Sequence, residues 1–189
     1  MLLETIRCID GEAQHLSFHQ IRLERTLYSL GVEKYYDLAS LITPPDNALY
    51  RCRFLYNADT FFLEFLPYLP KKIDSLKRVY VDNVDYSLKY ANRECLNTLY
   101  EQRGRCDDVL IIKNGFLTDT TISNIALFIE GKWLTPDKPL LMGTTRARLI
   151  DQGLVFPAPL HEKDLERASN IAIMNAMMGF IEVENGIIT

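Results

Sequence analysis

Three apolar runs follow one another between residues 108 and 136, and they constrain the fold more than any other part of the chain. They read DVLIIKN, FLTD and NIALFIEGKWLTP. Short runs rich in β-branched and large apolar residues are typical of buried strands. Asn114-Gly115 and Glu130-Gly131 fit tight turns between strands. The pattern therefore predicts an antiparallel meander inside a β-rich domain.

The carboxyl-terminal part of the chain supplies helices and further strands around this meander. The first helix is expected to bury Cys95, Leu96, Leu99 and Tyr100 and to end before Gly104. The expected elements are a strand over residues 78–84, helices over 94–103 and 145–152, an extended run over 155–160, a short helix over 160–168, and closing strands over 169–189 with a turn at Asn185-Gly186.

The amino-terminal part predicts a small set of hairpins and helices. Asp10-Gly11 lies where a tight turn would connect a strand over residues 2–10 to its partner EAQHL. Ser17 is expected to cap a helix that stops at Gly31. The remaining expected elements are a short helix over residues 35–42 and a hairpin of strands over 48–57 and 60–69.

A polar, proline-containing segment separates these two parts. Pro67 and Pro70 precede the run KKIDS, a composition typical of linkers. We therefore expect an α+β protein with an abbreviated small α+β domain over residues 1–70 and a larger domain over residues 71–189. The larger domain is expected to be β-rich with helices.

Composition excludes several classes of function. The 189 residues are 48% hydrophobic and carry a net charge of −4, with no basic cluster for nucleic acid or a membrane surface. The amino terminus has no signal peptide and no apolar run is long enough to span a bilayer, so we expect a cytoplasmic protein. No metal site or disulfide is expected, because the four cysteines lack zinc-site spacing: Cys8, Cys52, Cys95 and Cys106.

Two ionisable residues are candidates for chemistry. Lys89 lies in SLKYAN, just before a predicted helix, where partial burial would lower the amine pKa and make it nucleophilic. A lysine at this place can equally be a solvated surface charge. Asp119 follows a predicted strand and precedes a polar run, and it is either a functional carboxylate or an ordinary turn residue.

A third feature is a potential anion site. Gly143, Thr144 and Thr145 open a predicted helix, and helix amino termini offer backbone N–H groups and a positive dipole to a phosphate. Arg22 can add a bidentate charge partner. The alternatives are a plain helix start and a surface arginine. An amine, a carboxylate and phosphate donors together match the needs of a pyridoxal 5'-phosphate (PLP) enzyme.

Five short motifs resemble the class IV aminotransferases, the fold-type-IV PLP enzymes whose fold is that of D-amino acid aminotransferase. LETIRCIDG resembles the family's first hairpin, and SFHQIRLERTL resembles its helix with the phosphate arginine. KYANR resembles the Schiff-base lysine motif, in a form similar to the family's aminodeoxychorismate lyase branch. LTDTTISNIALF and LLMGTTR resemble the runs that contact the pyridine ring and the phosphate. The resemblance covers nearly the whole chain.

The resemblance implies a role for each of fifteen residues. It makes Lys89 the catalytic Schiff-base lysine and sets Asp119 against the pyridine nitrogen. It implies phosphate or other cofactor contacts for nine further residues: Arg22, Thr121, Ser123, Asn124, Gly143, Thr144, Thr145, Asn175 and Ala176. It implies contacts with the substrate for four: Thr5, Arg7, Asn92 and Arg93.

The chain departs from the family pattern in three places. The family acid is usually glutamate, and Asp119 is one methylene shorter. Asn175 and Ala176 stand where a late loop often offers hydroxyl groups to the phosphate. The chain starts at the Leu-Glu-Thr strand, so part of the substrate wall is expected to be absent or to come from another subunit.

The resemblance implies an enzyme that acts on a small molecule as a homodimer. The lyase reaction would eliminate pyruvate from 4-amino-4-deoxychorismate and leave 4-aminobenzoate for folate synthesis. A branched-chain or D-amino acid aminotransferase would use the same residues. A PLP-binding protein without turnover is a further alternative, because the small domain is short and Asp119 replaces glutamate.

Overall fold

The computed structural model describes residues 1–184 and 186–188, and the chain divides into two units. Unit 1 comprises Met1–Pro70 and Leu88–Asn92, and unit 2 comprises Lys71–Ser87 and Arg93–Thr189. Each unit contains helices and strands, which confirms the predicted α+β class. Asn185, the first residue of a predicted turn, lies outside the described residues.

Unit 1 contains a four-stranded antiparallel sheet in the order β2-β1-β3-β4. Both predicted hairpins are confirmed, and Asp10 and Gly11 connect β1 to β2 with φ of 55° and 75°. Such left-handed values suit a tight hairpin turn. The elements are β1 (Leu2–Ile9), β2 (Glu12–Ala13), α1 (Leu16–Ser29), α2 (Leu38–Leu41), β3 (Tyr50–Tyr56) and β4 (Phe61–Pro67).

The helices of unit 1 differ in detail from the prediction. Ser17 is not the cap of α1, because His15 occupies that position with φ of 54° and the helix already begins at Leu16. Gly31, with φ of 68°, follows the end of α1 as predicted. Helix α2 is only four residues long, and the Asp37 carboxylate accepts a hydrogen bond from its backbone.

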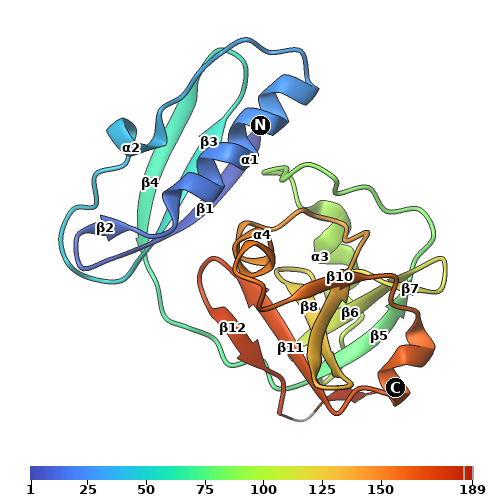
Figure 1. Ribbon diagram of the computed structural model, residues 1–189. Coiled ribbons are helices and arrows are strands. Elements are labelled where there is room, and N and C mark those ends of the chain that lie inside the picture. The colour runs from blue at the N-terminus through green and yellow to red at the C-terminus, as the bar shows by residue number, and fades with distance from the viewer. Residues whose placement is uncertain (185, 189) are drawn as a thin grey trace. The chain divides into compact units, whose positions relative to one another are not determined.

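Alternation along β1 turns Glu4, Ile6 and Cys8 toward helix α1. Leu23 and Leu27 of α1 are buried and belong to the same apolar cluster as Ile6 and Cys8. Figure 1 shows α1 lying across the sheet. The fully buried Glu4 is therefore a charged group inside an otherwise apolar layer, which requires compensation.

The segment 88–92 belongs to unit 1, although the predicted division at residue 70 assigned it to the larger domain. Its backbone pairs with the start of β1: Leu3 N donates to Lys89 O at 2.9 Å and Ala91 N donates to Met1 O at 3.0 Å. These bonds add the segment to the sheet that residues 1–70 form. Residues 88–92 are far along the chain from that sheet, so the sequence alone could not reveal that they pair with the start of β1.

Unit 2 is built on two sheets, with strand orders β13-β5-β6-β7 and β10-β9-β8-β11-β12. Unit 2 contains both helices and strands, as the sequence predicted for the larger domain. The elements are β5 (Leu76–Tyr80), α3 (Glu94–Glu101), β6 (Asp108–Lys113), β7 (Phe116–Leu117), β8 (Asn124–Ile129), β9 (Lys132–Pro136), α4 (Thr144–Asp151), β10 (Phe156–Ala158), the 3-10 helix η1 (Glu162–Glu166), β11 (Asn170–Asn175), β12 (Gly179–Glu182) and β13 (Ile187–Ile188).

The predicted meander is wrong as a single sheet. β6 and β7 form one hairpin and β8 and β9 form another, but the two hairpins belong to different sheets. A turn over residues 120–123 carries the chain from one sheet to the other, where Thr120 N donates to Ser123 O at 2.8 Å. Local sequence specifies each hairpin, but it does not specify which strand pairs with β7 or β8.

The core of unit 2 lies between its two sheets. Leu110 and Ile112 of β6 belong to one buried cluster with Ile125 and Leu127 of β8. The other face of the β8 sheet packs on α4, where Leu149 is buried. The beginning of β8 and helix α4 are thereby held close together. On α3 the predicted buried face is partly wrong, because Cys95 is exposed.

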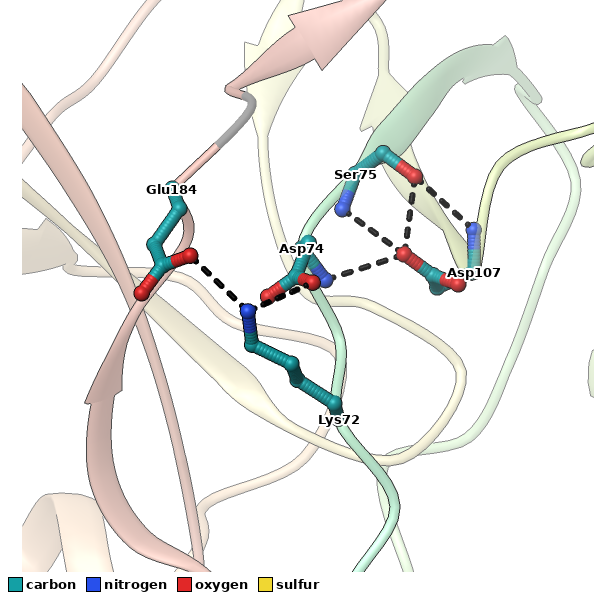
Figure 2. Close-up of polar contacts among 5 residues, drawn as sticks. All are labelled: Lys72, Asp74, Ser75, Asp107 and Glu184. Atoms are coloured by element: carbon teal, nitrogen blue, oxygen red, sulfur yellow. Dashed lines mark hydrogen bonds and ion pairs between the residues drawn. The ribbon is translucent and has the colours of Figure 1, made fainter.

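Polar contacts anchor the start of unit 2, as Figure 2 shows. The Asp107 Oδ2 accepts hydrogen bonds from the backbone N–H groups of Asp74 (2.9 Å) and Ser75 (3.0 Å) and from the Ser75 hydroxyl (2.8 Å). Lys72 Nζ contacts Asp74 at 3.0 Å and Glu184 at 2.8 Å. Residues 72–75 of the predicted linker are thus fixed to the start of β6 and to the residues that follow β12.

None of the described helices is both long and apolar enough to cross a membrane. All four cysteines are thiols, and Cys8 and Cys52 are buried in unit 1.

Candidate active site

Glu4 is the centre of a polar cluster in unit 1. Arg22 of α1 donates Nε to Glu4 Oε1 at 2.8 Å and Nη2 to Glu4 Oε2 at 2.5 Å. His19, three residues earlier on the same helix, places Nδ1 2.6 Å from Oε2. The spacing of three puts His19 and Arg22 on one face of the helix, above the strand that carries Glu4.

Neighbouring charges and burial together set the protonation states of Glu4 and His19. Burial alone would raise the pKa of Glu4, but Arg22 and His19 outweigh it and lower that pKa to about 2. Burial lowers the pKa of His19, so its imidazole is neutral and Nδ1–H donates to Glu4. The His19–Glu4 contact is therefore a hydrogen bond rather than an ion pair.

Arg22, the predicted phosphate residue, is held rigidly. Its side chain is only 12% exposed, and its contacts to Glu4 use Nε and Nη2. Glu4 binds the other two guanidinium nitrogens, so Nη1 can donate to a further acceptor. A rigid, partly buried guanidinium is well suited to bind an anion.

Lys89 is half-buried, and its backbone pairs with Leu3 of β1. Its positive charge contributes to lowering the pKa of His19, so the amine lies within electrostatic range of that ring. The structure therefore brings together Lys89, His19 and Arg22, which the sequence separates by up to 70 residues.

The predicted substrate residues of unit 1 lie elsewhere on this sheet. Thr5 and Arg7 are half-buried on the face of β1 opposite to Glu4. Across the sheet Arg7 pairs with Arg51, and the charges of both act on Tyr68, whose pKa is nevertheless raised by burial. Asn92 is exposed. This face of the sheet carries a positive charge that suits an anionic ligand.

Asp119 is the corresponding buried acid of unit 2. Its Oδ1 accepts a hydrogen bond from Asn124 Nδ2 at 2.7 Å, and its Oδ2 accepts one from the Leu141 N–H at 2.8 Å. Burial raises its pKa to about 7, against the opposing effects of Leu141, Asn124 and the charge of Arg146. A buried acid with such a pKa is a candidate functional group.

The start of helix α4 provides phosphate donors. Gly143 is its N-cap, no side chain of the described residues caps it there, and its first turn contains no acidic residue. Thr144 and Thr145 are buried. The first N–H groups of an α-helix have no acceptor within the helix. This donor set fits a phosphate group.

The turn between Asp119 and Asn124 is tied down by three outside contacts. Thr121 Oγ1 donates to Asp108 Oδ1 at 2.7 Å, and Arg93 Nη2 donates to Thr121 O at 2.7 Å. Asn175 Nδ2 donates to Ser123 Oγ at 2.9 Å. The Thr121 hydroxyl hydrogen is thus used within the protein, whereas the Ser123 hydroxyl can still donate.

Two predicted residues therefore support this turn. Arg93, predicted to contact substrate, binds the carbonyl of Thr121. Asn175 also accepts hydrogen bonds from Met177 N and Met178 N at 2.9 Å, so its amide shapes the late loop in which Ala176 is half-buried. Their contacts to a cofactor or substrate remain predictions.

Sequence reasoning missed three residues of these clusters. Glu4 and His19 lie inside the motifs LETIR and SFHQIR, but their pairing depends on how α1 packs on β1. Asp108 is buried at the start of β6, where burial raises its pKa. An acidic residue directly before a wholly apolar strand was the available sequence signal for Asp108.

Residues 58–185 match the family described as amino-transferase class IV, and this match covers more than half of the chain. The chain belongs to that family. Members of the class IV aminotransferase family are enzymes that depend on PLP. Within unit 2, the buried acid is chemically compatible with the pyridine ring of that cofactor and the uncapped helix start with its phosphate. Within unit 1, the rigid arginine is chemically compatible with a phosphate.

Several proteins are similar to this chain over most of its length. A Haemophilus influenzae protein of uncharacterized function is 42% identical over 185 residues, which cover 94% of this chain and 98% of that protein. A crystal structure from Haemophilus somnus 129pt, provisionally named 4-amino-4-deoxychorismate lyase, is 37% identical with a TM-score of 0.89, and the match covers 94% of this chain and 96% of that one. A Schizosaccharomyces pombe protein provisionally named aminodeoxychorismate lyase is 26% identical over 193 residues, which cover 88% of this chain and 82% of that protein.

Proposed function

We propose that this enzyme uses PLP to eliminate pyruvate from 4-amino-4-deoxychorismate, leaving 4-aminobenzoate. The observation that carries the proposal is the end-to-end likeness to the Haemophilus somnus structure, at 37% identity and a TM-score of 0.89. The Lys-x-x-Asn-Arg form at Lys89, which resembles the lyase branch, supports the same reaction.

Lys89 and Asp119 would perform the chemistry. PLP, when bound, supplies an electron sink conjugated to the substrate's amino group. The Lys89 amine would be the covalent attachment point for the cofactor until the substrate amine displaces it. The freed Lys89 amine would then take a proton from the carbon that bears the substrate amine and deliver a proton to the departing pyruvate. The Asp119 carboxylate keeps the pyridine nitrogen protonated, which requires Asp119 itself to be ionised.

The family resemblance assigns phosphate contacts to Arg22 in unit 1 and to the start of α4 in unit 2. Arg22 would offer Nη1 while Glu4 holds its other donors, and Gly143, Thr144 and Thr145 would offer N–H and hydroxyl groups. Thr121, Ser123, Asn124, Asn175 and Ala176 would line or support the remainder of the cofactor site.

The substrate is assigned to the basic face of the unit 1 sheet. 4-Amino-4-deoxychorismate carries carboxylates, and Arg7 lies directly opposite Arg51 across β1 and β3. Guanidinium groups are well suited to bind carboxylates. Thr5 lies on the same face. Asn92 and Arg93 are proposed to contact the substrate as well.

We also propose that the enzyme is a homodimer, as the family resemblance implies. Light scattering of the purified protein checks this oligomeric state.

Turnover with 4-amino-4-deoxychorismate tests the reaction. Purified enzyme with PLP is expected to release 4-aminobenzoate and pyruvate in equal amounts over many turnovers. Lys89→Ala is expected to release neither, while Lys71→Ala, at an exposed lysine, should behave as wild type. Rapid conversion by alanine, leucine or glutamate, reversed by a keto acid and without 4-aminobenzoate, would instead show an aminotransferase.

A further inference from the structure

The side chain of Asn124 lies between the Asp119 carboxylate and the loop that opens helix α4. Its Nδ2 donates one hydrogen to Asp119 Oδ1 at 2.7 Å and the other to Leu141 O at 2.8 Å. The Leu141 N–H donates to Asp119 Oδ2 at 2.8 Å. The three residues thus form a closed ring of hydrogen bonds, and each carboxylate oxygen has one fixed donor.

Gly143 shows how closely Asn124 packs against the start of α4. A Cβ atom placed on Gly143 would lie 2.0 Å from Asn124 Oδ1, far inside any normal contact. The backbone does not require glycine here, because φ is −70° and ψ is 145°, an extended conformation open to all residues. Glycine is therefore needed at position 143 for a steric reason, because any side chain there would clash with Asn124 Oδ1.

Burial prevents the cluster from adjusting. Asn124 is 5% exposed and Asp119 is 4% exposed. Protein interiors are close-packed, so a shift of one member of the ring must shift the others. The amide of Asn124 consequently links the position of the carboxylate to the position of the α4 N-cap.

We propose that Asn124 is a positioning residue that sets the Asp119 carboxylate relative to the start of helix α4. This inference rests on the proposed function, in which Asp119 meets the pyridine nitrogen and α4 binds the phosphate. The cofactor is small and its ring is rigid, so its nitrogen and phosphate need protein partners at a fixed separation. Partners displaced by a fraction of an ångström could not both bind well.

Binding of PLP and its 1-deaza analogue, in which carbon replaces the pyridine nitrogen, tests the proposal without requiring turnover. Wild type is expected to bind PLP about 10- to 100-fold more tightly than the analogue, the ratio for one hydrogen bond to a charged group. In Asn124→Ala this ratio is expected to fall toward one, because Asp119 is no longer aligned with the nitrogen.

A purely structural role predicts a different result for Asn124→Ala. General loosening of the site would weaken PLP and the analogue equally and leave their ratio unchanged. Asn97→Ala is the matched control, because Asn97 is an exposed residue of α3. It should alter neither affinity nor the ratio.

Gly143→Ala is the second variant, since it displaces the Asn124 amide without removing any hydrogen-bonding group. It should lower the PLP preference in the wild-type background. In the Asn124→Ala background it should have little further effect, because the atom that clashes is gone. This variant also carries the test if Asn124→Ala does not fold.

Three outcomes would overturn the proposal, and they are distinguishable. An unchanged ratio of PLP affinity to analogue affinity in folded Asn124→Ala would contradict the positioning role alone. So would independent reductions of this ratio by Asn124→Ala and Gly143→Ala. No preference for PLP over its analogue in wild type would contradict the role of Asp119 in the proposed function as well.

Discussion

Asp119 should make the cofactor-free protein less stable as the pH rises. Its ordinary pKa is 3.8, and burial raises the folded-state pKa to about 7. Between these values the folded state binds more protons than the unfolded state, so the free energy of unfolding falls with rising pH. Asp119→Asn should remove this decline. Urea unfolding of both proteins between about pH 4 and pH 8 checks it, and parallel curves would contradict it.

Asp119→Asn should also separate cofactor binding from turnover. A neutral amide cannot keep the pyridine nitrogen protonated, so bound PLP should remain while most 4-aminobenzoate release is lost. Asp119→Glu is expected to be impaired as well, because Leu141 and Asn124 already hold both oxygens of the shorter side chain. Full activity in Asp119→Asn would show that the carboxylate role belongs to another residue.

Lys89 should be the lysine that attaches to PLP. Borohydride reduction of the yellow protein, followed by peptide mapping, is expected to find the modification on Lys89. Lys89→Ala should lose the lysine-dependent absorption while keeping some phosphate-held cofactor. The exposed residue Lys71 is a suitable control. A modified lysine at any other position would refute the assignment.

At the scale of elements, Glu4 joins strand β1 to helix α1. Glu4→Gln would leave the 12%-exposed Arg22 without its carboxylate, and breaking a buried pair costs about 3–5 kcal/mol. Glu64→Gln is the control, because the Arg53–Glu64 pair is substantially exposed and should contribute less than about 1 kcal/mol. Chemical denaturation measures both losses, and equal effects would contradict the central role of Glu4.

The Glu4 pair also has a defined pH range. Its pKa falls from 4.5 to about 2 in the folded state, so its stabilisation is complete above about pH 4.5 and is lost as the pH falls toward 2. This trend is opposite in sign to that of Asp119. The two acids are therefore separable by comparing each variant with wild type across the acid range.

Helix α1 should contribute to phosphate binding through Arg22 alone. Arg22→Ala is expected to weaken PLP binding by about 1.5–3 kcal/mol, the range for a hydrogen bond to a charged group. Arg25→Ala, an exposed arginine on the same helix, should have little effect. Titration with PLP, and competition by inorganic phosphate, measures both. An equal loss from Arg25→Ala would indicate a general charge effect.

At the scale of the whole chain, the fold of unit 2 depends on the core between its two sheets. Leu127 of β8 is 0% exposed and lies in the cluster that includes Leu110 of β6. Leu127→Ala should therefore cost about 2–5 kcal/mol of unfolding free energy. Phe62→Ala, at a side chain 63% exposed on β4, should cost far less. Comparable losses would contradict this description of the core.

The sequence by itself determined the family and the local turns. Asp10-Gly11 and Asn114-Gly115 adopt the left-handed backbone that hairpins require, a property of these residues in isolation. The α+β class and the motifs around Lys89 and Asp119 were readable for the same reason. Each is specified within a short stretch of chain.

Only the tertiary structure decided which segments pair and which side chains meet. Strand-forming residues do not encode their partner, so the division of the expected meander between two sheets and the pairing of Lys89 with β1 could not be predicted. Likewise Asp119 meets the backbone of Leu141, 22 residues away, and Glu4 meets Arg22, 18 residues away. Such contacts form because burying the apolar faces of helices and sheets brings distant polar groups together, and buried charges then require the partners they find there.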